Sequence, residues 1–552
     1  MGRYLRALLG VAASGVVAVL VLSYTAGAQP VSGAVPGEVG VDVVSEAPGS
    51  VAGGGAVVGL VDAHAHLTAA VAFGGELRCG EPFAAGGAAE ALRGCDEHAG
   101  AQPGALLEAI LGGTDPMSAD QQGWPDFTQW PRNNTQLHEQ AYYRGVERAW
   151  RGGLRVVNVL LVANRVICEL YPERGSSCDE MDQIRVQARY LRDMQDYIDA
   201  EHGGAGRGWF RIVRTPAEAR AVAGQGKLAV VVGVESSELF GCRHIRDVAQ
   251  CTTADIDAGL DEMQALGVSN LYPVHKFDNA FGGTRFDEGA TGAAVNIGNL
   301  LTTGTWWAAQ RCDGAADNEQ ALASDLIAEL LPGGTAGETV LPVYPSGPIC
   351  NVRGLTDLGR YLIQGMIARG MIINIDHMGV RTAREVLDIL ESVGYAGVMS
   401  SHTWSDREII DRTIALSRFV ASYAHAAHDP DPKLSFLAEW RANRAAGHGG
   451  QITGYGFGSD VNGLGPQAPP RPDAAQTPLR YPFTAPNGAV LDRHRFGTRT
   501  FDINTDGVAQ YGLYADWFAD IIQAAGDDGP TLARDLMNGA ESYVAMWESA
   551  RA

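Results

Sequence analysis

The segment Val57–His66, with the sequence VVGLVDAHAH, decides the fold. It is an apolar, β-branched run that ends in His-Ala-His, and such a run is typical of a parallel strand buried on both faces. Because side chains alternate along a strand with a period of two, His64 and His66 lie on the same side of it. The segment therefore predicts a buried strand with two imidazoles at its carboxyl end.

Seven similar runs follow along the chain. They are Leu154–Ala163, Lys227–Glu235, Asn270–His275, Met371–His377, Gly397–His402, Arg418–Ala424 and Thr453–Asp460. Amphipathic helical patterns separate them, and two of these patterns stop at Gly267 and at Gly394, a plausible residue to follow a helix end. Eight strands alternating with helices predict an α/β fold, a single (β/α)8 barrel of the TIM type, rather than an open doubly wound sheet. No glycine-rich nucleotide motif follows any of the strands.

The amino terminus reads as a secretory signal peptide. Arg3 and Arg6 precede an apolar stretch, and Ala26-Gly27-Ala28 supplies the small-x-small cleavage pattern. We expect a signal peptide over 1–28, a flexible linker over 29–55 and the barrel over 56–552. An uncleaved membrane anchor is the alternative. The expected product is exported, secreted or periplasmic, with no stable membrane anchor after cleavage.

Composition excludes some partners. The chain of 552 residues has 64 acidic against 42 basic side chains and a formal charge of −22, which argues against nucleic acid as the main partner. The connections 67–153 and 276–370 are far longer than usual βα loops. Since loops that follow strands lie at the catalytic face of such a barrel, we expect these long loop insertions to wall a pocket.

The eight cysteines form four couples along the chain. An even count in an exported protein favours disulfides. The expected pairs are Cys79–Cys95, Cys168–Cys178, Cys242–Cys251 and Cys312–Cys350. Buried free thiols are the alternative.

Polar residues capable of metal binding end five of the eight runs. They are His64, His66, Glu235, His377, His402 and Asp460. A single histidine at a strand end is usually structural, but the ends of barrel strands converge on one mouth, so these six side chains can meet. His64 and His66 would hold one divalent ion and His377 and His402 another, with Glu235 between the two. Asp460 would orient a water molecule and take its proton.

Five blocks, in order, resemble the membrane (renal) dipeptidases, the M19 peptidases of the amidohydrolase superfamily. The blocks are His64-Ala65-His66, Arg211–Glu235, Leu266–His275, Gly354–His377, and Ser401-His402 with Gly458-Ser459-Asp460. The resemblance spans most of residues 57–465. It implies a binuclear zinc hydrolase, with two Zn²⁺ per chain, in which a metal-bridged hydroxide attacks the carbonyl of a small peptide or amide.

The resemblance also implies residue roles. His64 and His66 would bind one zinc, His377 and His402 the other, and Glu235 would bridge them. Asp460 would act as general base, and His275 would contact the substrate and stabilise the oxyanion.

Three departures from the family pattern bear on these roles. His66 stands where the family usually has aspartate, which exchanges an anionic ligand for a neutral one. Ser236-Ser237-Glu238 follow the bridging glutamate in place of two glycines, and Glu238 becomes a minor candidate for the acidic role. The family's arginine for the substrate carboxylate lies downstream of the second-metal histidine, where Arg407 and Arg412 are both available.

Two other functions are compatible with the sequence. One is a non-peptidase amidohydrolase, such as a lactonase, an acyl-amino-acid hydrolase or a cyclic-amide hydrolase. The other is a catalytically silent, exported binding barrel whose long insertions recruit a partner. Metal content and dipeptide turnover distinguish the three.

Overall fold

A computed structural model of the protein describes residues 38–47, 55–100, 102–112, 115, 117, 120–313, 341–447 and 454–551. The expected signal peptide over 1–28 lies outside the described residues. Within them, no helix is long and apolar enough to cross a membrane.

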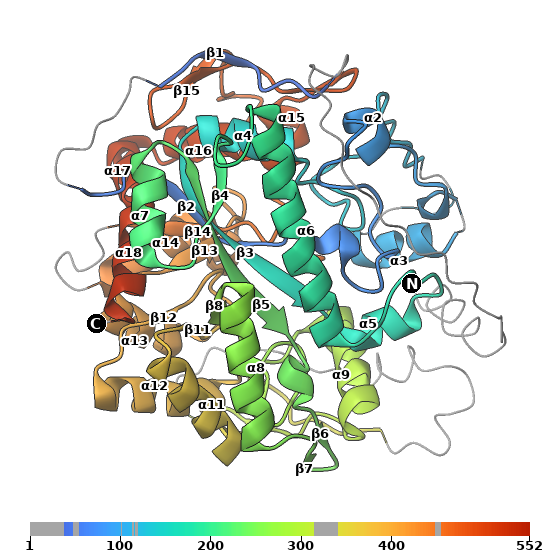
Figure 1. Ribbon diagram of the computed structural model, residues 1–552, viewed down its shortest axis with the longest axis vertical. Helices are drawn as coiled ribbons and strands as arrows, with labels where there is room; N and C mark the ends of the chain where they lie inside the picture. Colours follow the sequence, from blue (N-terminus) through green and yellow to red (C-terminus); the bar gives the residue numbers. More distant parts are fainter. Residues whose placement is uncertain are drawn as a thin grey trace.

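Eight parallel strands form the barrel at the centre of the molecule (Figure 1). In chain order they are β2 (Leu60–Ala65), β3 (Leu154–Ala163), β5 (Leu228–Ser236), β8 (Val268–Leu271), β11 (Ile372–Asn374), β12 (Val398–Met399), β13 (Ala421–Tyr423) and β14 (Gly456–Gly458). Consecutive strands pair from β2 to β12, β13 pairs with β14, and β14 pairs with β2, so β12 and β13 are the two ends of the strand order. The backbone N–H of Ala421 donates to the carbonyl of Ser400 at 3.1 Å, which links β13 to the end of β12. All eight predicted strands and the (β/α)8 fold are thereby confirmed.

Helices surround the barrel (Figure 1). They are α4 (Tyr143–Arg151), α6 (Glu180–Glu201), α7 (Pro216–Gly224), α8 (Thr253–Leu266), α11 (Asp357–Ala368), α12 (Val380–Val393), α13 (Arg407–Ser417), α14 (Phe436–Ala446), α16 (Tyr514–Ala524), α17 (Gly529–Met537) and α18 (Gly539–Ser549). Gly267 and Gly394 follow α8 and α12 in the left-handed region, at φ values of 89° and 68°, as predicted.

β3 and β5 form the longest strand pairing of the barrel. Eight consecutive residues are paired, from Val156 opposite Ala229 to Ala163 opposite Ser236. The opposite edge of β5 is shared. The short strand β4 (Phe210–Ile212) pairs with its first half and β8 with its second half. The sequence did not predict β4, because three residues are too few to show a strand pattern.

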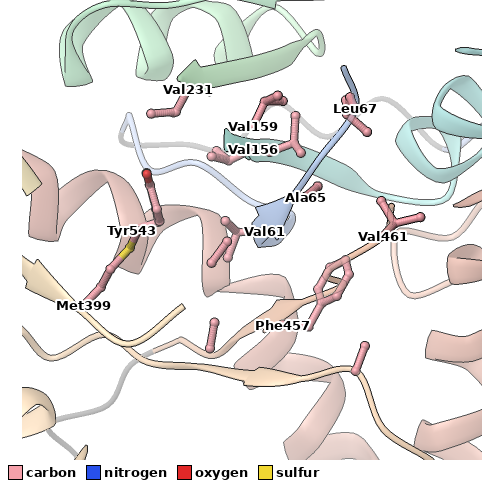
Figure 2. Close-up of a cluster of buried hydrophobic side chains, with 14 of the residues drawn as sticks. Val61, Ala65, Leu67, Val156, Val159, Val231, Met399, Phe457, Val461 and Tyr543 are labelled. Atoms are coloured by element: carbon pink, nitrogen blue, oxygen red, sulfur yellow. The ribbon is translucent and has the colours of Figure 1, made fainter. Parts of the chain in front are cut away.

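The strands and the helices around them share one apolar core. Figure 2 shows that β2, β3, β14 and α18 contribute Val61, Val156, Phe457 and Tyr543 to one cluster. Each of these side chains is at most 1% exposed. Burial of this kind is the main favourable term for the fold.

The two predicted insertions contain structure of their own. The first carries α2 (Ala88–Ala91) and α3 (Pro103–Gly112). The second carries α9 (Gly289–Thr303) and the antiparallel pair β9 (Ala309–Arg311) and β10 (Ile349–Asn351). The short helix α5 (Arg165–Leu170) follows β3.

A third long connection, residues 459–513, was not predicted. It carries β15 (Phe483–Thr484), β16 (Val490–Leu491), β17 (Arg495–Phe496), β18 (Arg499–Thr500) and α15 (Ile503–Asp506). β16 pairs with β1 (Val43–Ser45), and Val39 is buried in the core. Residues 38–47 of the expected flexible linker are therefore packed on this connection, because an edge strand there supplies hydrogen-bonding partners.

Four disulfides join the predicted pairs of cysteines. Cα–Cα distances are 6.0 Å for Cys79–Cys95, 5.6 Å for Cys168–Cys178, 5.0 Å for Cys242–Cys251 and 4.9 Å for Cys312–Cys350. All four distances lie in the usual range for a bridge. The pairing and the absence of free cysteines among the described residues are as expected from the sequence.

The Gly354–Gly359 block has a packing role at the start of α11. The Thr356 side chain accepts from the backbone N–H of Gly359, and its own N–H donates to the Phe281 carbonyl at 2.9 Å. A Cβ at position 359 would overlap that carbonyl oxygen. The glycine therefore lets α11 pack directly on the loop that follows β8.

We predict that Gly359→Ala destabilises the protein by about 1–3 kcal/mol, because backbone must move to make room. Gly224→Ala is the matched control, since nothing lies within 4 Å of the new methyl group in α7. The control should change stability by between zero and about 1 kcal/mol in the favourable direction. Denaturant unfolding of both variants measures the difference, and equal stabilities would contradict the packing role of Gly359.

Candidate metal centre

Seven polar side chains predicted from the sequence meet at the carboxyl ends of the barrel strands. They are His64 and His66 from β2, Glu235 from β5, His275 after β8, His377 after β11, His402 after β12 and Asp460 after β14. All but Asp460 are buried, and Asp460 is the most exposed of them, with 16% of its side chain accessible. The barrel closure therefore brings together residues that lie almost four hundred positions apart.

Four of these atoms surround one point. His66 Nε2 lies 3.1 Å from His64 Nε2, 3.2 Å from Glu235 Oε2 and 3.1 Å from Asp460 Oδ1. His64 Nε2 lies 3.5 Å and 3.4 Å from the same two oxygens. Ligands about 2.0–2.1 Å from a tetrahedral ion stand about 3.3–3.4 Å apart. The spacing of the His64, His66 and Asp460 atoms fits one small divalent cation, and Glu235 Oε2 borders the same group.

The second oxygen of Glu235 faces a different set of histidines. Glu235 Oε1 lies 3.3 Å from His377 Nε2 and 3.4 Å from His275 Nε2. His377 Nε2 in turn lies 3.1 Å from His402 Nε2. The carboxylate of Glu235 thus stands between two groups of nitrogen ligands, one on each oxygen.

The outer ring nitrogens of three histidines have their own partners. His66 Nδ1 lies 2.9 Å from the Leu160 carbonyl, and His402 Nδ1 lies 2.8 Å from Asp376 Oδ2. Since both partners accept hydrogen bonds, these Nδ1 atoms act as donors, and each Nε2 atom faces the centre. His64 Nδ1 lies 3.0 Å from Ser401 Oγ and 2.9 Å from Tyr272 Oη.

A buried network holds these partners in place. Asp376 accepts from the backbone N–H groups of Ser401 and His402 as well as from the His402 ring. Burial opposes its charged form, but His402 and these hydrogen bonds outweigh burial and keep the pKa of Asp376 well below its usual value. Asp376 therefore remains a carboxylate that orients His402.

The carboxylates at the centre are also held in the charged form. Burial favours the neutral acid, yet His275 and His64 outweigh it and lower the pKa of Glu235 well below its usual value. For Asp460, burial is likewise outweighed by hydrogen bonds from His64 and His66, which lower its pKa. Burial itself lowers the pKa of His275 to about 4. Two anions surrounded by imidazoles, one of them buried, form an environment that suits a cation.

The backbone at the mouth takes conformations that non-glycine residues rarely adopt. His377, Thr403 and Asp460 have φ values of 66°, 53° and 48°. Such strain persists only where surrounding contacts hold it, and it is concentrated at functional sites.

Arg407 and Arg412 are each engaged with other side chains of the described chain. Arg412 pairs with Asp388 and Glu391 between α12 and α13, on the outside of the barrel. Arg407 contacts Asp411 and Asn443. Both belong to α13, and the sequence could not show which way a helical side chain points. A substrate-binding role for either arginine stays a prediction.

Glu238, the minor acidic candidate, is also engaged elsewhere. Both its oxygens accept hydrogen bonds from Arg165, at 2.9–3.1 Å. Glu235 is therefore the carboxylate of this segment that reaches the centre.

A cationic group beside His377 was missed in the sequence. The guanidinium of Arg285 lies over the Trp404 ring, 4.8 Å from its centroid, and the Arg285 backbone N–H donates to the His377 carbonyl at 2.7 Å. Arg285 is 8% exposed, and no carboxylate among the described residues pairs with it. Lys276 lies 5.7 Å from the same ring centroid but is paired with Asp287. The contact with Trp404 is what sets Arg285 apart from other arginines, and the sequence does not show that contact.

No family model and no curated protein matches the chain. Among solved structures it is similar to the dipeptidase AC, an M19 metallopeptidase, with 14% identity, a TM-score of 0.39 and coverage of 72% of this chain and 86% of that one. It is also similar to a metallopeptidase from Rhodobacter sphaeroides liganded with a phosphinate mimic of L-Ala-D-Ala, with 12% identity, a TM-score of 0.43 and coverage of 90% and 99%. A third is the probable dipeptidase PvdM from Pseudomonas aeruginosa, with 12% identity, a TM-score of 0.38 and coverage of 73% and 88%.

We predict that Asp376→Asn lowers metal affinity at the His377–His402 group by roughly 10–100-fold, because His402 loses the charged partner that orients it. Titration with a competing chelator measures the effect. Asp388→Asn makes the same chemical change on the outer surface and should leave affinity unaltered. Equal affinities for the two variants would show that Asp376 does not support the centre.

Proposed function

We propose that this protein is a binuclear metal-dependent hydrolase of peptide or amide bonds, with dipeptidase-like activity. The observation that carries the proposal is the position of Glu235. Its two oxygens lie 3.2–3.5 Å from Nε2 atoms of two separate histidine pairs, His64 with His66 and His275 with His377. A bridging carboxylate between two ions has this arrangement.

The residues present fit zinc as the cofactor, at two ions per chain. The donors are imidazole nitrogens and carboxylate oxygens, and their spacing on the His64 side suits tetrahedral coordination. Glu235 Oε1 is buried and accepts no hydrogen bond, so a cation would satisfy it. His64, His66, Glu235 and Asp460 would hold one ion, and Glu235, His377 and His402 the other.

Such ions supply Lewis-acid polarisation of a carbonyl and activation of water near neutral pH. The protein's own residues would do the rest. Of the two carboxylates at the centre, Asp460 has the more solvent-accessible side chain. It would therefore accept the proton of the attacking water and pass it to the leaving amine. His275 is neutral at pH 7 and would donate an N–H to the developing oxyanion.

Arg285 replaces Arg407 and Arg412 as the proposed anchor for an anionic substrate group. A buried guanidinium with no carboxylate partner is costly unless a ligand completes its hydrogen bonds. The Nε atom of Arg285 and the Nε1 atom of Trp404 are both buried donors without an acceptor. Both residues adjoin His377, so a substrate carboxylate bound there would lie next to the second group of ligands.

We also propose that the protein is exported. Eight cysteines in four disulfides are typical of an oxidising compartment. The expected signal peptide, cleaved between Ala28 and Gln29, is tested by amino-terminal sequencing of the protein recovered from the medium or periplasm.

Metal analysis combined with substrate screening tests the activity. We expect two zinc ions per chain and hydrolysis of L,L- or L,D-dipeptides. Two ions with turnover of lactones or acyl-amino acids alone would overturn the dipeptidase assignment, and a chain without bound metal would identify a binding protein.

Asp460→Asn should lower kcat by roughly 10²-fold or more, because the amide cannot act as general base. Zinc supplied in excess should still bind, since His64, His66 and Glu235 remain. Steady-state kinetics and metal content on the same preparation check both expectations. Turnover at the wild-type rate would remove Asp460 from the mechanism.

Arg285→Gln should lower kcat/KM by roughly 10–100-fold for a dipeptide with a free carboxylate, because a charge-assisted bidentate hydrogen bond is lost. The carboxamide of the same dipeptide should be affected far less. Arg412→Gln is the matched control and should alter neither substrate. Equal losses on the acid and the amide would contradict the anchoring role.

A further inference from the structure

A second group of potential metal ligands lies in the first insertion, away from the barrel mouth. Cys79, Cys95 and His138 each offer a ligand atom, and these atoms lie within 4.8 Å of one another. The ring of His98 stands edge-on to that of His138, with centroids 4.8 Å apart. His98 follows Cys95 by three positions, so one short turn supplies two of the four side chains.

The two histidines of this group lack partners. His98 is 1% and His138 0% exposed, and none of their four ring nitrogens forms a hydrogen bond within the described chain. The nearest anion is Glu108, whose Oε2 lies 3.9 Å from His138 Nδ1 but already accepts from the Leu137 backbone. A buried imidazole always carries at least one N–H, so leaving all four nitrogens unpaired is costly.

The surrounding backbone fixes these side chains. Cys79 and His138 are opposite each other in a parallel bridge, in which the Cys79 N–H donates to Leu137 at 2.9 Å and the Glu139 N–H donates to Cys79 at 2.8 Å. A Cβ at Gly104 of α3 would overlap the His98 ring. The glycine allows α3 to cover this ring closely and to exclude water.

We propose that Cys79, Cys95, His98 and His138 form a zinc site of the Cys2His2 type when the Cys79–Cys95 disulfide is reduced. Two thiolates and two imidazoles are one of the usual ligand sets of structural zinc sites, and the two thiolates would neutralise the charge of the ion. Zinc would also satisfy one nitrogen of each histidine. The same insertion would then be cross-linked either by the disulfide or by the zinc ion.

The interconversion balances with a dithiol as the reductant. The dithiol transfers two electrons and two protons to the Cys79–Cys95 bond, which breaks to give two thiols, and the reductant closes to its own disulfide. Binding of Zn²⁺ then releases both thiol protons. Oxidation reverses these steps and expels the ion.

This site adjoins the turn that carries Asp460. Arg78, next to Cys79, donates to the Asn462 side chain at 2.9 Å and also to its carbonyl. The Asn462 side chain lies 3.1 Å from Glu139 Oε1. The insertion is therefore joined to the barrel mouth immediately behind these cysteines.

Cobalt substitution provides a specific test, since thiolate ligands give a charge-transfer absorption that nitrogen and oxygen ligands do not. The barrel centre contains no cysteine, so the absorption reports only on sulfur sites. We expect it to appear, with one additional metal per chain, after the full-length protein is treated with a dithiol under anaerobic conditions. The oxidised protein should show neither.

Variants identify the ligands. Cys79→Ser with Cys95→Ser should abolish the absorption, and His98→Gln and His138→Gln should each weaken metal binding at least tenfold. The matched control, Cys168→Ser with Cys178→Ser, should retain it. An absorption that survives loss of Cys79 and Cys95, or that is indifferent to both histidines, would overturn the proposal.

A second measurement needs no variant. In reduced wild-type protein, zinc should protect Cys79 and Cys95 from alkylation at least tenfold, while Cys168 and Cys178 remain reactive, as mapped by mass spectrometry of peptides. Equal protection or equal reactivity of the two couples would contradict the site. The outcome does not depend on hydrolase activity, so it is separable from the proposed function.

Discussion

The carboxylate of Glu235 is the constraint on which the rest of the structure depends. It is 3% exposed at the centre of the barrel mouth, and a buried anion is tolerated only when opposite charge or hydrogen bonds surround it. His64, His66, His275 and His377 supply those neighbours from three other strand ends. The barrel must therefore bring these three strand ends to the Glu235 side chain.

Beneath this carboxylate the barrel interior is polar, and that is unusual for a parallel barrel. The Asn270 side chain donates to Asn158 at 2.6 Å, and Asn374 donates to Ser401 at 2.9 Å. Ser401 also contacts Tyr272, which reaches the outer nitrogen of His64. Most polar atoms of these fully buried groups are paired with one another and so orient His64, while Asn270 Oδ1 has no hydrogen-bond partner among the described residues.

The fold could be predicted because the barrel strands are short apolar runs that alternate with amphipathic helical patterns. Leu154–Ala163, for example, was predicted with the bounds that the structure has. Short elements without periodicity, such as β4, were not predicted. The connection 459–513 was also missed, because it lies beyond the last strand, where no further barrel element marks its length.

The site could be predicted only in part, for a related reason. His64, His66, Glu235, His377, His402 and Asp460 stand at strand ends, and closure of the barrel forces such residues together. Arg407 and Arg412 stand on a helix, where a shift of one position turns a side chain by about 100°. Tyr272, Asp376 and Arg285 act through contacts with loops distant in sequence, so no local pattern marks them.

The histidine at position 66 affects the net charge of the centre, and that charge bears on the proposed substrate. Within the part of the chain that the structure describes, only Glu235 and Asp460 place a carboxylate within 3.5 Å of the inward nitrogens of His64 and His66. Two carboxylates would not neutralise the two divalent ions of the proposed centre, and a neutral imidazole at position 66 would add no negative charge. Arg285 contributes a further positive charge beside His377 and has no acidic partner in the described chain. A pocket with excess positive charge favours an anionic substrate over a neutral one, because the anion restores electroneutrality where water is largely excluded. The same excess would stabilise an oxyanion as it develops, so a neutral ligand at position 66 and the position of Arg285 would act in the same direction.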